Sequence, residues 1–218
     1  IAGDMTAHSQ AIVQTRKQLK GNAGTSPHQV AQIYGQMLQQ IRHREAEDRI
    51  LAPLGLNMET FISQQKEMSK QTVDRLLTQL QDYEGEPTEA IVVGFDTATN
   101  YADLYEVDQR GTARCYTDIG FAAIGNGARL SSTQLMSLPY SNEWALARTL
   151  AALYSAKKLA EMSPNVGRST DVSLITRDGV RAIWPNAVAK LDDLRQRYQV
   201  ETEKLTSAAL GELQAFFD

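Results

Sequence analysis

The sequence predicts an α+β protein in which antiparallel strands lie between layers of helices. Two observations carry this prediction. Helical and strand-like segments alternate in the order helices, strands, helices, strands, helix. Both strand regions also have the pattern of hairpins, and hairpin strands pair antiparallel, which argues against a doubly wound parallel sheet. The 218 residues, 42% of them hydrophobic, suffice for a sizeable core in one large domain or two small ones.

The first forty residues predict a short strand end followed by two helices. The stretch SQAIVQTRKQLKG, residues 9–21, has basic residues late and glycine last, which are helix-end signals. Ser26, Pro27 and Gln29 then form the pattern of a capping box with proline at the first helical position. Apolar residues follow at spacings of three and four, so we expect a helix over 26–42 with one apolar face.

Residues 43–87 differ in composition, since they are charged and rich in glutamine. Their pattern is helical but is broken at Pro53, Gly55 and Asn57, which predicts two short amphipathic helices. The sequence EGEP closes the segment as a loop. We expect 43–87 to be a helical insertion outside the core, because layered cores tolerate insertions that leave them intact.

From residue 88 the pattern changes to strands. EAIVVGFD, residues 89–96, is an apolar run of buried-strand length, and residues 103–118 predict a hairpin that turns at Arg110-Gly111. The apolar run IGFAAIG, residues 119–125, is expected to form a further strand. It ends in Gly125-Asn126-Gly127, where two glycines permit a tight turn and a close approach of the backbone.

Two helical stretches follow, over 127–138 and 142–162. Ser141 or Asn142 is expected to cap the second of them, which ends before Pro164. The segment AKKLAE within this helix is expected to be a solvated face.

The last strands and the last helix are predicted from the remaining fifty residues. TDVSLITRDGVRAIWP, residues 170–185, predicts a second hairpin that turns at Asp178-Gly179. A helical pattern then runs from Ala187 almost to the end, so we expect a C-terminal helical extension over 187–218.

Composition argues against several classes of function. The formal net charge of −4 argues against a nucleic-acid-binding face, which is usually basic. No run of eighteen apolar residues predicts a membrane span, and no leader pattern is seen, so the expected location is cytoplasmic. The one cysteine, Cys115, excludes an internal disulfide. His8, His28 and His43 lack the spacing of metal ligands and are expected on the surface, with no metal or cofactor.

Four separate pieces of the chain, in order, resemble the proteasome-type N-terminal-nucleophile (Ntn) hydrolases. They are IAGD at 1–4, SPHQVAQIYGQMLQQI at 26–41, the strand region AIVVGFD…LYEVDQRG…FAAIGNGA, and AALYSAKKLAEMSPNVGRSTDVSLITRDGV at 151–180. The resemblance covers 1–42 and 88 to about 190. It implies a single domain over 1–218, folded as a four-layer αββα sandwich of antiparallel sheets.

The resemblance also implies a reaction, the hydrolysis of peptide bonds by an N-terminal threonine. The nucleophile must be the first residue of the mature chain, because its α-amino group serves as the base. Ile1 offers no nucleophile, so we expect the threonine, with its supporting lysine and aspartate, to precede the residues seen here.

Three residues near the start match the family's substrate site. Gly3 matches the glycine whose backbone N–H donates to the oxyanion, and Ile1 and Met5 match positions that wall the pocket for the residue before the cut. Both of these are apolar here, which favours an apolar side chain in that pocket.

The turn at 125–127 matches the family's helper site, with differences. Asn126, flanked by Gly125 and Gly127, stands where the family has a serine that helps to hold a water or relay a proton, and asparagine shuttles protons poorly. The family's later Asp-x-x-Ser pair aligns on Ser163 and Val166, so both of its members are changed.

These features leave three hypotheses. The first is a threonine-type peptidase subunit that acts on peptides or unfolded proteins. The second is a non-catalytic ring or scaffold subunit of the same fold, and the third is an unrelated helical adaptor. For the first two we expect self-association into rings, because the family buries helix faces such as those at 26–42 and 142–162 against neighbours. Residues 43–87 would then cap a ring face or gate an entrance, and no ATPase partner is identified.

Overall fold

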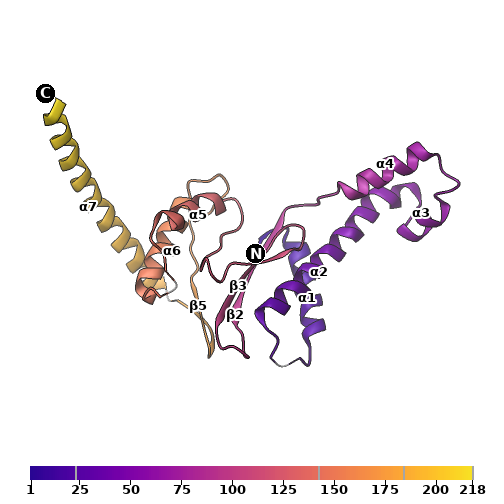
Figure 1. Cartoon of the computed structure of the whole chain (residues 1–218), viewed down its shortest axis with the longest axis horizontal. Helices are drawn as coiled ribbons and strands as arrows, with labels where there is room; N and C mark the ends of the chain where they lie inside the picture. The colour runs from indigo at the N-terminus through magenta and orange to yellow at the C-terminus, as the bar shows by residue number, and fades with distance from the viewer. Residues whose placement is uncertain (23, 142, 184, 218) are drawn as a thin grey trace. The chain divides into compact units, whose positions relative to one another are not determined.

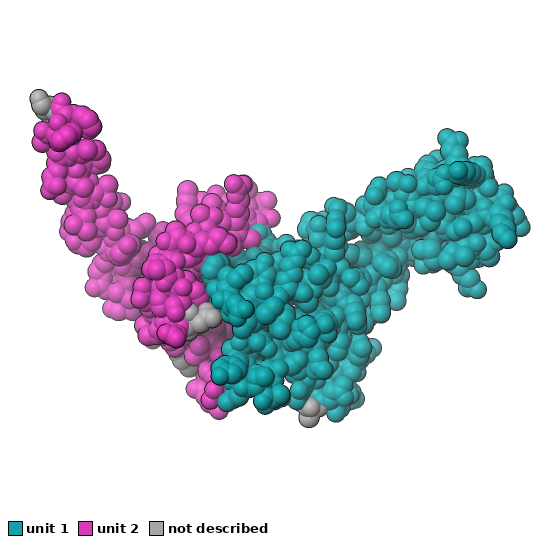
Figure 2. Space-filling model, in the orientation of Figure 1, with its two compact units in different colours: residues 1–125 teal, residues 126–218 magenta. Residues whose placement is uncertain are grey.

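The computed structural model describes residues 1–22, 24–141, 143–183 and 185–217. Across these residues it contains seven α-helices, a four-strand antiparallel sheet and a two-strand hairpin, which confirms the α+β class. The chain divides into two compact units, residues 1–125 and 126–218, which Figure 2 shows in different colours.

The first unit begins with two capped helices. Helix α1, Met5–Leu19, starts earlier than the pattern at 9–21 predicted, because the Asp4 side chain accepts from the Thr6 N–H and caps the first turn. Helix α2, Pro27–Ala46, begins with the predicted capping box, in which Ser26 and Gln29 each bond the backbone N–H of the other.

Helix α2 does not end at residue 42 as predicted. Residues 43–46 contain neither glycine nor proline, so the helix continues to Ala46 and passes directly into a π-helical turn over Glu47–Leu51. A 3₁₀ turn over Ala52–Leu54 follows and ends at Gly55, whose φ of 72° is left-handed.

The four-strand sheet has the order β1-β2-β3-β4, and every neighbouring pair is antiparallel. Its strands are β1, Ala2–Gly3; β2, Thr88–Phe95; β3, Ala102–Val107; and β4, Ala113–Cys115. The predicted turn between β3 and β4 is confirmed, since the Gly111 N–H donates to the Asp108 carbonyl at 2.8 Å.

Helices α1 and α2 cover one face of this sheet and form the main core of the unit (Figure 1). The buried members of the core are Ala7, Ala11, Ala31, Tyr34, Met37, Leu38, Ile41, Ala90 and Val107. Gly35 of α2 lies so close to Gly111 that a Cβ on either residue would overlap the carbonyl of the other. A hydrogen bond of 2.9 Å from the Gln39 side chain to the Arg110 carbonyl fixes the same contact.

Strand β2 carries apolar side chains on both of its faces. Ala90 and Val92 point toward the helices, and strand alternation places Ile91 and Val93 on the opposite face. Leu104 of β3 pairs with Val93 and shares that second face, and Val93 is 45% exposed. A strand that is apolar on both faces is typical of a sheet that is covered on both sides.

The predicted strand over 119–125 is wrong. Tyr116 still bonds to the Leu104 carbonyl at 2.8 Å, but the Gly120 N–H then donates to the Tyr116 carbonyl, so the chain turns out of the sheet. None of the residues from 116 to 125, all of which are described, is assigned to a strand.

The region 43–87 contains two short helices, as predicted. They are α3, Met58–Gln64, and α4, Lys70–Gln81, and Figure 1 shows them beyond the C-terminal end of α2. Leu51, Phe61 and Leu76 are buried together in a separate hydrophobic cluster, apart from the main core. The Arg42 side chain donates to the Glu86 carbonyl at 3.3 Å, so the two ends of the 43–87 region lie close together beside the main core. That this region is an insertion stays a prediction.

The second unit contains α5, Ala128–Ser137, and α6, Leu146–Ala160, packed against each other.

The predicted start of α6 at residue 142 is wrong, because the helix begins at Leu146. The Ser141 side chain accepts from the Glu143 N–H at 3.2 Å, and its carbonyl accepts from the Trp144 N–H. These bonds form a turn before the helix, and the alternative cap, Asn142, lies outside the described residues.

The second hairpin and the last helix are confirmed. Strands β5, Ser173–Thr176, and β6, Gly179–Ala182, pair antiparallel around a two-residue loop at Arg177-Asp178, one position earlier than predicted. Helix α7, Pro185–Phe217, follows β6, contacts α6 and projects beyond it (Figure 1). It has no buried residue over its length. In the described part of the chain no helix is long and apolar enough to cross a membrane.

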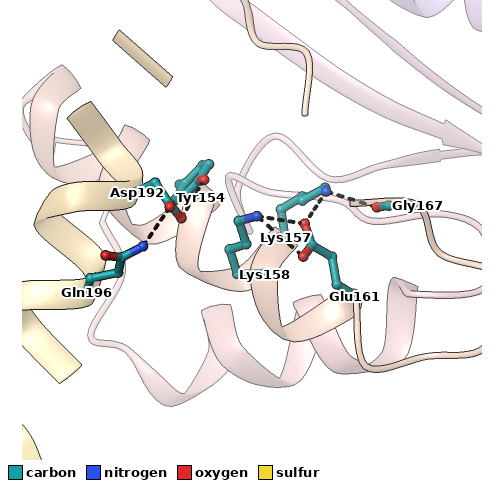
Figure 3. A network of polar contacts seen from close by, with 7 residues as sticks. All are labelled: Tyr154, Lys157, Lys158, Glu161, Gly167, Asp192 and Gln196. Atoms are coloured by element: carbon teal, nitrogen blue, oxygen red, sulfur yellow. Dashed lines mark hydrogen bonds and ion pairs between the residues drawn. The ribbon is translucent and has the colours of Figure 1, made fainter. Parts of the chain in front are cut away.

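A polar network joins α6 to the following loop and to α7 (Figure 3). The Glu161 carboxylate accepts hydrogen bonds from Lys157 and Lys158, and the Lys157 ammonium also bonds the Gly167 carbonyl at 3.0 Å. On α7, Asp192 accepts from the Tyr154 hydroxyl at 2.9 Å. The expectation that AKKLAE is a solvated face is therefore wrong, because the side chains of both lysines and of Glu161 are largely buried.

The hydrophobic cluster of residues 43–87 gives a first testable prediction. Phe61→Ala should cost about 3 to 5 kcal/mol within that cluster, the usual effect of emptying a buried aromatic site. Hydrogen exchange should show that the amides of α3 and α4 lose protection while those of β2 and β3 keep theirs. The neighbouring exposed Ile62 gives the control Ile62→Ala, which should leave both regions unchanged. Loss of protection in β2 and β3 as well would show that the region belongs to the core.

The network at Glu161 gives a second prediction, on pH. Burial raises the pKa of the Glu161 carboxyl, but hydrogen bonds from Lys157 and Lys158 more than offset this and hold the pKa below its ordinary value. A depressed folded-state pKa adds stability above the unfolded pKa, and that stability is lost as the pH falls through the folded value. Glu161→Gln should therefore lower Tm by about 3 °C at pH 7, and the difference should shrink below about pH 4. The exposed Glu212 supplies the control Glu212→Gln, and a pH-independent difference would contradict the argument.

Candidate functional site

The candidate site lies around β1, and its most buried member is His8. The His8 ring has no exposed surface; its Nε2 lies 2.9 Å from the Ala2 carbonyl oxygen, and its Nδ1 is hydrogen-bonded to the Tyr34 hydroxyl. Burial raises the pKa of Tyr34 to about 12, so this hydroxyl keeps its proton. A carbonyl can only accept, so Nε2–H donates to Ala2 and Nδ1 accepts from Tyr34.

The expectation of surface histidines is wrong for His8 and is confirmed for His28 and His43, which are exposed. His8 is buried because the first turn of α1 brings it back over β1. The sequence did hold a signal for this, since His8, Ala11 and Thr15 recur at helical spacing on the buried face of α1.

Gly3 pairs with Thr88 at the edge of the sheet in a conformation that only glycine adopts easily. Its φ is 104°, and a Cβ at this position would overlap the Pro87 carbonyl. The fold alone therefore explains why residue 3 is glycine. Donation from its N–H to an oxyanion stays a prediction.

The structure brings Gly125 to β1. The Gly125 N–H donates to the Glu89 carboxylate at 2.9 Å, and Glu89 is the strand partner of Ala2. A Cβ at Gly125 would lie 3.1 Å from the Cβ of Ala2, and its φ of 79° again favours glycine. Sequence reasoning missed Glu89, although an acidic residue near the start of an apolar strand was a usable signal.

Gly127 belongs to the second unit, where it precedes the first residue of α5. A Cβ there would lie 2.7 Å from the Cβ of Ala160 and 3.3 Å from the Cγ2 of Val166, so the glycine permits close packing of α5 on α6. Ser163 and Val166, which align on the family's support pair, form a turn beside it, with the Val166 N–H bonded to the Ser163 carbonyl. Asn126 itself is exposed.

Ile1 and Met5 are 53% and 61% exposed. Their assignment to the wall of a substrate pocket stays a prediction. The first unit does have a cleft of about 740 Å³ between α2, α4 and the β3–β4 turn, but other residues line it, among them Arg42, His43 and Leu80. No group of three metal-ligating side chains occurs among the described residues.

A scan against protein-family models and a search of the curated proteins found no match to this chain. The described residues establish an α+β fold and the contacts around β1.

The packing of Gly127 gives a third prediction. Gly127→Ala should destabilise the second unit by about 1 to 3 kcal/mol, because the added methyl group meets Ala160 in a closely packed contact. Urea denaturation followed by far-UV circular dichroism would measure this. Gly167→Ala is the matched control, since a Cβ at Gly167 meets open space and should change the free energy of unfolding little. Equal effects in the two variants would refute the packing argument.

Proposed function

We propose that this chain is a subunit of a proteasome-type Ntn hydrolase, which cuts peptide bonds with an N-terminal threonine-type nucleophile located outside residues 1–218. The observation that carries the proposal is the contact of Gly125 with β1 through Glu89. The resemblance requires the G-x-G turn and the opening glycine strand to meet, although they are distant in the sequence. The contact between Gly125 and Ala2 satisfies that requirement for the first glycine of the turn.

The two-sided strand β2 supports the sandwich part of the proposal. Helices α1 and α2 cover one face of the sheet, and Ile91, Val93 and Leu104 leave the other face apolar. A second antiparallel sheet packed on that face would give the αββα layering, with side chains of the two inner faces interdigitating.

In the proposed reaction the nucleophile's hydroxyl attacks the carbonyl carbon of the peptide bond. The α-amino group of the same residue takes the proton and later gives it to the departing amine, and water hydrolyses the resulting ester. The Gly3 N–H would donate a hydrogen bond to the oxyanion. One such donor lowers the activation barrier by roughly 3 kcal/mol. Asn126 would orient the amine by hydrogen bonding, because an amide both donates and accepts.

A second candidate function is a non-catalytic ring or scaffold subunit of the same fold. It is favoured by Ser163 and Val166, which lack the functional groups of the family's support pair. The fold also explains Gly3 and Gly127 without any substrate. Leu146 and Leu153 lie exposed on one face of α6, which suits the self-association that both candidates require.

A labelling experiment on the product of the full gene distinguishes the two candidates. Intact mass and N-terminal sequencing would show whether processing exposes a threonine, serine or cysteine. A peptide carrying an electrophilic warhead should then modify that residue, and mass spectrometry should locate the adduct there. Absence of both the nucleophile and the adduct would favour the scaffold.

Asn126 gives a fourth prediction, on activity. Asn126→Ala should slow hydrolysis of a fluorogenic peptide or self-processing, because the amine loses a fixed polar partner. Its Tm should barely change, since residue 126 is exposed. Gly3→Val should be more damaging, and the structure adds a reason, because the side chain would strike the Pro87 carbonyl and disturb folding as well. Unchanged activity in Asn126→Ala would remove Asn126 from the site.

A further inference from the structure

We propose that His8, oriented by Tyr34, is a positioning residue that fixes the direction of the Gly3 N–H. This inference rests on the proposed function, in which that N–H receives the oxyanion. It assigns a role to a buried pair that no sequence motif indicated.

The contacts form a chain from the core to β1. The Tyr34 hydroxyl, on α2, donates to His8 Nδ1, and His8 Nε2–H, on α1, donates to the Ala2 carbonyl at 2.9 Å. Both residues are buried, and their ring planes are only 13° apart. Tyr34 is itself buried in the main core, so this series of hydrogen bonds starts from a rigidly packed residue.

The Ala2 carbonyl and the Gly3 N–H belong to one peptide group. That group is planar and trans, so the N–H points opposite to the C=O, and fixing the oxygen also fixes the N–H. A hydrogen bond accepted by the carbonyl further polarises the group and makes its N–H a stronger donor. Gly3 has no side chain to restrain it, so an external hold on this peptide group matters more than it would elsewhere.

A purely structural role would not need this chemistry. The neighbouring buried positions of α1 are Ala7, Ala11 and Thr15, so small residues suffice to pack this face. Burying an imidazole and a phenol is costly unless their polar atoms find partners. Both His8 nitrogens do find them, and one of those partners is the carbonyl next to Gly3.

The test compares three variants in the full, processed protein. His8→Leu should lower kcat for a fluorogenic peptide about tenfold with KM unchanged, because a misdirected oxyanion donor weakens binding of the transition state rather than of the substrate. His8→Gln should restore most of kcat, since its amide N–H can still donate to Ala2. Tyr34→Phe should lie between them, because His8 keeps its donor but loses the partner that orients it.

A second readout, the ¹H chemical shift of the Gly3 amide, does not depend on activity. It should move in His8→Leu and return in His8→Gln. If the unmodified protein hydrolyses no peptide, the proposed function fails, and the amide shift alone decides the positioning role. If His8→Leu does not fold, Tyr34→Phe compared with His8→Gln carries the same comparison. An unchanged Gly3 shift, or an unchanged kcat in folded variants of an active protein, overturns the inference.

Discussion

Helix α2 lies so close to the β3–β4 turn that neither Gly35 nor Gly111 has room for a side chain. A glycine inside a helix costs about 1 kcal/mol of stability relative to alanine. The burial that the close approach permits must offset this cost. Tyr34, Met37, Leu38 and Ile41 of α2 are buried on the sheet and on α1. Burial of these large side chains in one core holds the helices and the sheet of the first unit together.

The position of α2 determines two other parts of the unit. Its Tyr34 hydroxyl reaches His8 and, through it, the backbone of β1, so the candidate site is held from the core rather than from a surface loop. Its far end continues into the π-helical turn that begins the 43–87 region, and Arg42 bonds the chain where that region returns. One helix therefore connects the candidate site to the 43–87 region.

The elements with strong local signals were predictable from the sequence. The capping box at Ser26, both hairpins and the last helix depend on neighbours within a few residues, and the structure has all of them. The strand expected at 119–125 failed because an apolar run does not say whether the chain stays in its sheet, and here a turn at Gly120 removes it. Local patterns mark His8 and Glu89 as positions of interest, but their partners Tyr34 and Gly125 lie 26 and 36 residues away, so no local pattern identifies the contacts.

Helix α7 differs from the other long helices, because every residue from 196 to 217 is exposed. Its local support consists of pairs one turn apart, such as Gln196 with Asp192 at 2.9 Å and Lys204 with Glu201 at 2.8 Å. Such pairs add only about 0.2 to 0.5 kcal/mol of helix stability each. Gly211, inside the helix, lowers its stability further because glycine has a low helix propensity. The outer part of α7 is thus governed by the helix–coil equilibrium of a peptide in water, in which nucleation is costly and each further residue gains little. On warming, its helicity declines gradually and separately from the melting of the packed units.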